Sequence, residues 1–177
     1  MKDFSLKFLD IMIGLVLGLG FQWWPELNEP WQFVAFVFVY LDIVDYWIDY
    51  GPGLKKFSPK YEVDIFLDVA IMFSLFLYIY TTQLTLVYFL SAFILLRVLD
   101  FFWLLRSQYQ YHPTGMDGKY IRTWLEFDFI ECILVGGFAI LAYFQYFSSL
   151  TILAVFIIFR VVMRFLASLR YKRVHFA

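Results

Sequence analysis

Cysteine and histidine are scarce in this sequence, which contains one cysteine, Cys132, and two histidines. A single cysteine excludes an internal disulfide and a cysteine-rich metal site. His112 has no metal-ligand partner at helical spacing, so we interpret it as a solvated loop residue. The sequence also lacks a glycine-rich phosphate loop, a serine nucleophile elbow and a zinc signature. We therefore expect no resident cofactor, and enzymatic activity is not our leading interpretation.

A strong net charge is also missing, because 14 Lys and Arg residues nearly balance 15 Asp and Glu residues. A net charge of −1 gives no electrostatic bias towards nucleic acid. What the chain has in excess is apolar side chains, which make up 63% of its 177 residues and give a mean hydropathy of +0.73. Soluble domains are usually about 45–50% apolar. The composition therefore predicts an integral membrane protein whose principal partner is the lipid bilayer.

Long apolar stretches organise the whole chain into a single transmembrane domain, 1–177. Each is about 20 residues long, which is the length that an α-helix needs to cross a bilayer. They lack the alternating pattern of barrel strands, so we expect an all-α fold. The six predicted transmembrane helices are 6–24, 31–50, 62–80, 84–106, 124–144 and 150–169.

The connections between these stretches differ in length and charge. The short connections at 25–30, 81–83 and 146–149 contain no Lys or Arg. The longer connections at 51–60 and 107–122 contain Pro, Gly and basic residues. Because basic residues accumulate on the cytoplasmic side of membrane proteins, the pattern predicts three helical hairpins with both chain ends in the cytoplasm. We expect a multi-pass protein of the cell's inner or plasma membrane.

A weak internal repeat accompanies the three predicted hairpins. The first helix of each contains an acidic residue in a similar apolar setting: Phe8-Leu9-Asp10-Ile11, Phe66-Leu67-Asp68-Val69 and Phe129-Ile130-Glu131-Cys132. Repeats of this kind are common in transporters. The pattern indicates a possible pseudo-threefold arrangement of related hairpins.

Ionisable residues lie inside the predicted helices, in their cytoplasmic halves. Such charges are costly in hydrocarbon, so they are expected to face one another or a water-filled cavity. The predicted ion- or substrate-binding residues are acidic and the predicted counter-charges are arginines: Asp10, Asp42, Asp45, Asp49, Asp68, Asp100 and Glu131, with Arg97, Arg160 and Arg164. Because the acids outnumber the arginines, the balance requires protonated carboxyls, a cation or a cationic ligand.

This acidic excess favours a small transport or channel-like protein with a cytoplasm-facing intramembrane cavity that handles protons or a cation. Enclosing a pore would require a homo-oligomer or a membrane-protein partner. A second interpretation is a non-enzymatic membrane subunit or sensor, in which Arg97 and Arg160 form structural ion pairs that fix the helix packing. The sequence leaves both interpretations open.

A third interpretation comes from the acidic stripe Asp42-x-x-Asp45-x-x-x-Asp49. It resembles the aspartate-rich signature of intramembrane prenyltransferases of the ubiquinone-biosynthesis type, and Asp64-x-x-x-Asp68 is similar to their second motif. The resemblance implies that Asp42, Asp45 and Asp49 hold Mg²⁺ against a lipid diphosphate, since carboxylate oxygens are suitable ligands for Mg²⁺. The chain departs from that family in having fewer helices and no Asn before Asp42.

Overall fold

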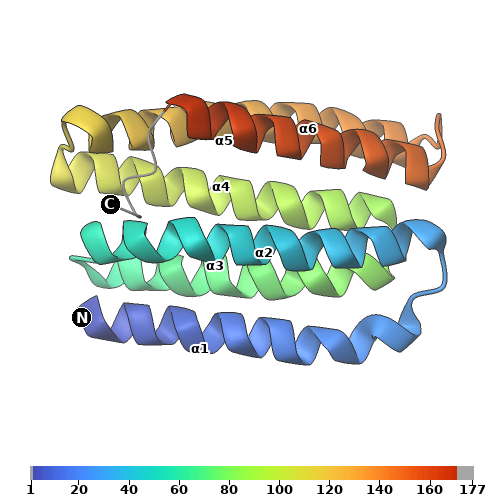
Figure 1. The fold of residues 1–177 in the computed structure, drawn as a ribbon, viewed down its shortest axis with the longest axis horizontal. Helices are drawn as coiled ribbons and strands as arrows, with labels where there is room; N and C mark the ends of the chain where they lie inside the picture. The colour runs from blue at the N-terminus through green and yellow to red at the C-terminus, as the bar shows by residue number, and fades with distance from the viewer. Residues whose placement is uncertain (1, 171–177) are drawn as a thin grey trace.

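The chain is all-helical over residues 2–170, which the computed structural model describes with side chains from Lys7 onward. This confirms the predicted all-α class, and no strand occurs within that range. The expected cytoplasmic C-terminal residues, 171–177, lie outside it. The described elements are α1 (Lys2–Gly20), η1 (Phe21–Glu26), α2 (Pro30–Lys56), α3 (Glu62–Tyr80), η2 (Thr81–Gln83), α4 (Leu86–Tyr111), α5 (Gly115–Tyr143) and α6 (Ser149–Arg170), as Figure 1 shows.

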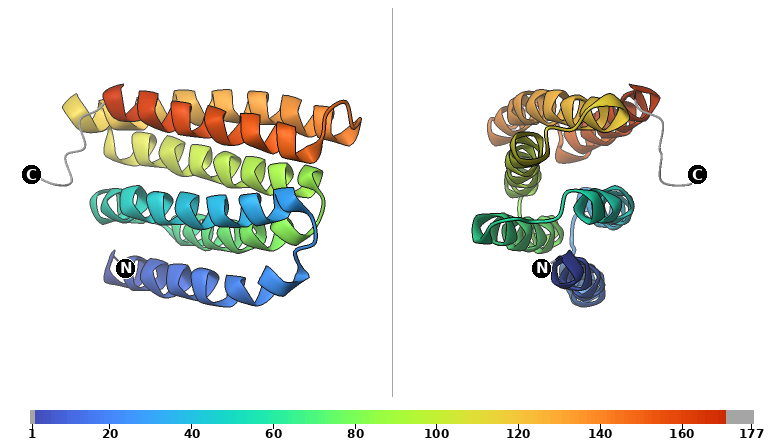
Figure 2. Two further views of the ribbon diagram at one scale, coloured as in Figure 1. Left: turned by 45° about the vertical axis from the view of Figure 1, so that its right-hand side comes forward. Right: turned by 90° about the vertical axis from the view of Figure 1, so that its left-hand side faces the viewer.

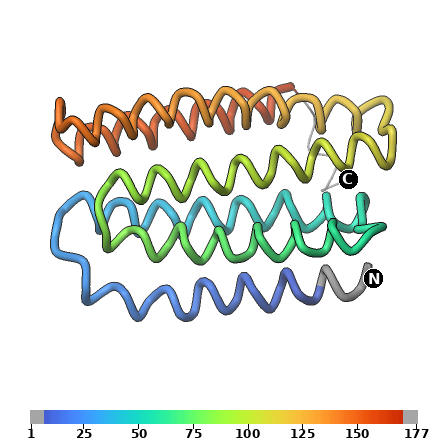
Figure 3. Tube along the Cα trace, turned by 180° about the vertical axis from the view of Figure 1, so that it is seen from behind, coloured from blue at the N-terminus to red at the C-terminus, as the bar shows by residue number. Residues whose placement is uncertain are grey.

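The α-helices lie side by side along the long axis of the molecule, and each runs opposite to the one before it (Figures 1 and 3). One end, here called the η1 end, carries η1, η2 and the α5–α6 connection. The other end, here called the terminal end, carries the α2–α3 and α4–α5 connections, the start of α1 and the end of α6. The short and the longer connections of the sequence are therefore separated onto opposite ends.

Five of the helices surround a common interior. Each of α2 to α6 packs against the next in chain order, and α6 packs back against α2. Viewed along the bundle, α1 lies outside this ring against α2 and α3 (Figure 2). Its buried residues Leu9, Ile13 and Val16 are spaced four and three apart, so they form one helix face. The first helix therefore covers the ring without lining its interior.

The helix α2 extends further than the sequence predicts. It continues through Gly51-Pro52-Gly53 to Lys56, where we expected a loop from residue 51. Proline in a helix removes one backbone hydrogen bond. Burial offsets this loss, because Leu54 is 1% exposed and Phe57, just after the helix, is 6% exposed. The ring of Phe57 also packs against Trp103, with the ring centroids 6.4 Å apart.

The connection between α4 and α5 is much shorter than the predicted loop at 107–122. It comprises only residues 112–114, because α4 continues to Tyr111 and α5 already begins at Gly115. His112 and Gly115 have positive φ angles of 44° and 61°, which reverse the chain within a few residues. Gly118 allows the turn to close, since a Cβ atom there would lie 2.6 Å from the carbonyl oxygen of Pro113.

The molecule has an apolar exterior and a charged interior. Phe66, Phe73 and Ile158 are 72%, 63% and 64% exposed, whereas Arg97 and Glu131 are 3% and 0% exposed. Water-soluble proteins have the opposite distribution. Five of the described helices are long and apolar enough to cross a membrane, namely α1, α2, α3, α4 and α6. This distribution supports the prediction of a membrane protein.

The remaining helix, α5, differs because acidic residues interrupt its apolar part. Of these, Glu126 lies on the surface, whereas Asp128 and Glu131 are 1% and 0% exposed. Residues three positions apart share a helix face, so the two buried acids point together into the ring. Asp128 and Glu131 therefore belong to the interior of the bundle, whereas Phe129 and Ile133 lie on the outer face of α5 and are 58% and 59% exposed.

Candidate functional site

All five helices of the ring contribute ionisable side chains to one buried layer. At about 1.5 Å per residue, Asp42, Arg97 and Arg160 lie roughly 16–18 Å from the starts of their helices at the η1 end. The layer is thus near the middle of the bundle. Seven ionisable residues of this layer are at most 9% exposed, and we call them the buried charge network: Asp42, Asp68, Arg97, Asp100, Asp128, Glu131 and Arg160. Asp49 is 8% exposed but lies two helical turns beyond Asp42 on α2, outside this layer.

Arg97 is the centre of the acidic groups on α4 and α5. Its Nη1 atom lies 3.1 Å from Asp100 Oδ2 and 3.4 Å from Asp128 Oδ1, to which it donates a hydrogen bond. Its Nε atom lies 3.6 Å from Glu131 Oε2. The guanidinium group also lies 5.1 Å from the centroid of the Phe93 ring. A single buried cation therefore faces three carboxylates from two helices.

Arg160 connects α6 to both sides of the ring. Its Nε atom donates to Asp42 Oδ1 on α2 at 3.2 Å, and its Nη1 atom donates to Glu131 Oε1 on α5 at 2.8 Å. Glu131 is therefore shared, with one oxygen facing Arg160 and the other facing Arg97. This shared carboxylate connects the two buried arginines into one network.

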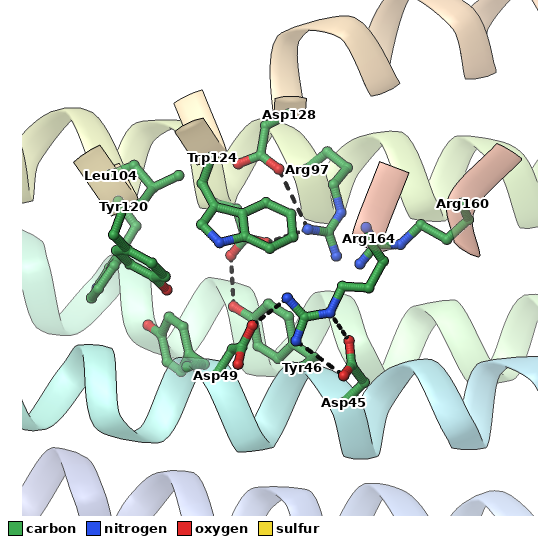
Figure 4. Close-up of a pocket in the computed structure, with 13 residues that line it drawn as sticks. Asp45, Tyr46, Asp49, Arg97, Leu104, Tyr120, Trp124, Asp128, Arg160 and Arg164 are labelled. Atoms are coloured by element: carbon green, nitrogen blue, oxygen red, sulfur yellow. Dashed lines mark hydrogen bonds and ion pairs between the residues drawn. The ribbon is translucent and has the colours of Figure 1, made fainter. Parts of the chain in front are cut away.

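Arg164 lies one helical turn further towards the terminal end and forms ion pairs with Asp45 and Asp49 (Figure 4). These two acids are four residues apart on α2, so they present one face to α6. Their side chains are 33% and 12% exposed, and that of Arg164 is 14% exposed. The cluster therefore marks the place where the buried charge network approaches the surface between α2 and α6.

Two tyrosines of α2 donate hydrogen bonds to buried carboxylates on neighbouring helices. Tyr46 Oη donates to Asp100 Oδ1 at 2.6 Å, and Tyr50 Oη donates to Asp68 Oδ1 at 2.8 Å. The two rings are stacked, with centroids 5.1 Å apart. Hydrogen bonds to charged groups are stronger than those between neutral groups. The two tyrosine hydroxyls therefore help to stabilise the carboxylates of Asp100 and Asp68 in the interior.

A cavity of about 50 Å³ lies among these groups (Figure 4). One water molecule needs roughly 10–15 Å³ of such volume, so the cavity has room for a few waters. The residues that line it include both tyrosines, all three arginines and four of the acids: Tyr46, Tyr50, Arg97, Arg160, Arg164, Asp45, Asp49, Asp100 and Asp128. The cavity therefore has both charged groups and apolar groups in its lining, and the latter include Trp103, Leu104 and Trp124.

Aromatic side chains close the interior on the η1 side of the network. Tyr78, Phe89, Phe93 and Phe156 are all 0% exposed and come from α3, α4 and α6. Tyr78 stacks on Phe89 at 5.1 Å between centroids, and Phe93 meets Phe156 edge-on at 5.0 Å. We call these four residues the aromatic seal. It lies between the polar layer and the η1 end.

The structure brings most of the sequence-predicted site residues together. The predicted residues in the buried charge network are Asp42, Asp68, Asp100, Glu131, Arg97 and Arg160. The other three, Asp45, Asp49 and Arg164, form the neighbouring ion-pair cluster between α2 and α6. Asp10 lies apart, because α1 is outside the ring. Its side chain is exposed and accepts a hydrogen bond from Trp47 Nε1 at 3.0 Å. Asp10, one of the predicted binding residues, therefore does not join the others in the ring.

Sequence reasoning missed other members of the site. Asp128 is 1% exposed and pairs with Arg97, and its three-residue spacing from Glu131 was the available signal. Tyr46 and Tyr50 had no such signal, because tyrosines near the end of a predicted span also suit the membrane interface. Asp64 forms a separate cluster with Arg106 and Gln110 near the terminal end.

The three aspartates of the proposed Mg²⁺ stripe are paired with arginines, Asp42 with Arg160 and the other two with Arg164. No group of three or more His, Cys, Asp or Glu side chains is arranged to hold a metal ion in the part of the chain that the structure describes. The geometry therefore does not support the prenyltransferase interpretation. Comparison with protein-family models, curated proteins and solved structures gives no match.

Proposed function

We propose that the protein is a small membrane transport protein whose cavity takes up protons from the cytoplasm. The observation that carries this proposal is the excess of acid: seven carboxylates face three guanidinium groups in and beside the cavity. They are Asp42, Asp45, Asp49, Asp68, Asp100, Asp128 and Glu131, against Arg97, Arg160 and Arg164. Uncompensated charge is costly in a buried site, so this excess calls for bound protons or a cation.

Protons fit the geometry better than a metal cation. Hard cations such as Ca²⁺ or Mg²⁺ take about six or more oxygen ligands at 2.0–2.6 Å. Here arginines contact the carboxylates of α2, α4 and α5, and tyrosine hydroxyls donate to Asp100 and Asp68. The cavity of about 50 Å³ has room for a few waters, through which protons could exchange.

Open hydrogen-bonding positions add to this argument. Within the described residues, Arg97 Nη2, Asp128 Oδ2 and the Tyr78 hydroxyl are buried and have no hydrogen-bond partner. Buried polar groups are usually satisfied by protein or water. Waters at these positions would connect the cavity to the inner carboxylates, and Tyr78 would mark the boundary of that path at the aromatic seal.

The proposed topology has six spans arranged as three hairpins, with the terminal end in the cytoplasm. The distribution of basic residues supports it, because those outside the site whose side chains the structure describes all lie in the part of the bundle nearer the terminal end: Lys7, Lys55, Lys56, Lys60, Arg106, Lys119, Arg122 and Arg170. In this orientation the cavity opens to the cytoplasm, and the aromatic seal lies on the outer side. Transport then requires the seal to open, for example through movement between the hairpins or between copies in an oligomer.

Proton flux in proteoliposomes tests the proposal. The purified protein would be reconstituted with an entrapped pH dye, and a potassium diffusion potential would be imposed. We expect wild-type protein to carry flux, the Asp42→Asn/Asp45→Asn variant to lose it, and Asp10→Asn, an exposed aspartate outside the ring, to retain it. Absence of flux in folded wild-type protein, or undiminished flux in the double variant, would refute the proposal.

A second candidate function is a membrane subunit whose charges are structural. The observation that favours it is that Arg97 faces three carboxylates and Arg160 faces two, a degree of pairing that also fixes helix packing. This interpretation requires Arg97→Leu to be strongly destabilising, because it leaves buried carboxylates without their cation. Strong destabilisation combined with no flux in wild-type protein would favour the structural role.

A further inference from the structure

A second pocket lies at the terminal end, between the start of α5 and the end of α6. Its volume is about 440 Å³, within the usual range for small-molecule sites. The α4–α5 connection forms one wall, through Pro113 and Thr114. The ionisable residues that line it are Lys119, Arg122, Glu126 and Arg170. It is separate from the buried charge network and independent of the proposed proton uptake.

Cations predominate in this pocket. Its one acid, Glu126, already forms an ion pair with Arg170 at 2.6 Å. Asp117, two residues before Lys119, forms an ion pair with Lys56 of α2, also at 2.6 Å. Lys119 and Arg122 are exposed, and neither has a carboxylate within ion-pair distance among the described residues. The pocket therefore has two cationic side chains without an acidic partner among the described residues. A bound anion would balance their charge.

An apolar surface continues from the pocket towards the middle of the bundle. Ile130 lies four residues after Glu126 on α5, and Leu166 lies four residues before Arg170 on α6. Residues four apart share a helix face. Ile130 is 41% exposed and Leu166 is 44% exposed. An anionic headgroup in the pocket would therefore have a hydrocarbon-compatible surface directly beneath it, along α5 and α6.

We propose that this pocket binds the phosphate group of an anionic phospholipid in the cytoplasmic leaflet. Arg122 and Lys119 would contact the phosphate oxygens, and Arg170 would be held beside them by Glu126 and by the Phe127 ring, 5.0 Å from its guanidinium group. Arginine suits phosphate because its planar fork of N–H donors matches the phosphate oxygens. Basic pockets between helices on the cytoplasmic side are suited to such headgroups.

Native mass spectrometry of the purified protein tests this proposal. Detergent-solubilised protein would be titrated with dioleoylphosphatidylglycerol, with dioleoylphosphatidylcholine and, separately, with inorganic phosphate as a competitor. The test variant is Lys119→Gln/Arg122→Gln. The control is Lys7→Gln/Lys55→Gln, which removes the same charge from the same end of the molecule but outside the pocket. We expect the test variant to bind phosphatidylglycerol roughly 30-fold more weakly, and the control to match wild type.

Three results would overturn the proposal. These are equal binding of the two lipids to wild type, undiminished phosphatidylglycerol binding by a folded test variant, and an equal loss in the control variant, which would indicate surface charge in general. Displacement of the lipid by millimolar inorganic phosphate would support a phosphate-binding site. It would also show that this site accepts soluble phosphate in addition to the lipid headgroup. Proton flux is measured separately, so failure of one proposal leaves the other standing.

Discussion

Glu131 and Arg160 form a fully buried ion pair between α5 and α6, with 2.8 Å between Glu131 Oε1 and Arg160 Nη1. The other carboxylate oxygen of Glu131 faces Arg97 at 3.6 Å. One acid therefore joins two arginines that are 63 residues apart in the sequence. The pair lies beside the cavity, because Arg160 is one of the residues that line it.

Loss of the Glu131 charge is expected to destabilise the bundle. Glu131→Gln leaves two buried guanidinium groups short of a carboxylate, and breaking a buried pair costs about 3–5 kcal/mol. The matched control is Glu126→Gln on the same helix, whose exposed pair with Arg170 is expected to contribute about 0–1 kcal/mol. Thermal unfolding in detergent measures both variants. Equal midpoints for the two would contradict a structural role for the buried pair.

Opening the aromatic seal is expected to make the bundle leak protons. Phe93→Ala removes a ring that is 0% exposed and contacts Phe156 and Arg97, at a cost of about 3–5 kcal/mol. The cavity would then extend towards the η1 end. Passive proton leak through proteoliposomes should rise above that of wild type, whereas Phe73→Ala, on the 63% exposed outer face, should not change it. A folded Phe93→Ala protein without added leak would show that this ring is not the barrier.

Two glycines of α5 are expected to respond oppositely to alanine. At Gly118 a Cβ atom would lie 2.6 Å from the Pro113 carbonyl oxygen, so Gly118→Ala should cost about 1–3 kcal/mol. At Gly136 nothing lies within 4 Å, so Gly136→Ala should be neutral or stabilise the helix by up to about 1 kcal/mol. Chemical denaturation of the two variants measures the difference. A stable Gly118→Ala protein would mean that the turn before α5 relaxes easily.

The proposed orientation can be checked by cysteine labelling. In a Cys132→Ser background, Asn28→Cys places a thiol at the η1 end and Lys55→Cys places one at the terminal end. Because basic residues favour the cytoplasmic side, we expect a membrane-impermeant maleimide to label Asn28→Cys in intact cells. Lys55→Cys should be labelled only after lysis. Labelling with the reverse pattern would place the cavity on the outer side.

The sequence by itself determined the all-helical class, the approximate positions of the helices and the inward placement of most charges in the middle of the predicted helices. These features depend on local composition, because about 20 apolar residues span a bilayer and a charge facing lipid is costly. Helix ends were less predictable. The chain passes through Gly51-Pro52-Gly53 as helix because the residues after it become buried, which no local pattern indicates.

Only the tertiary structure decided which charges meet. Asp10 is excluded from the network because α1 packs outside the ring, whereas Asp128 is included because α5 turns that face towards Arg97. Tyr46 reaches Asp100 across 54 sequence positions. The physical reason is that spacing along a helix fixes which side chains share a face, while packing of all the helices fixes the direction in which that face points.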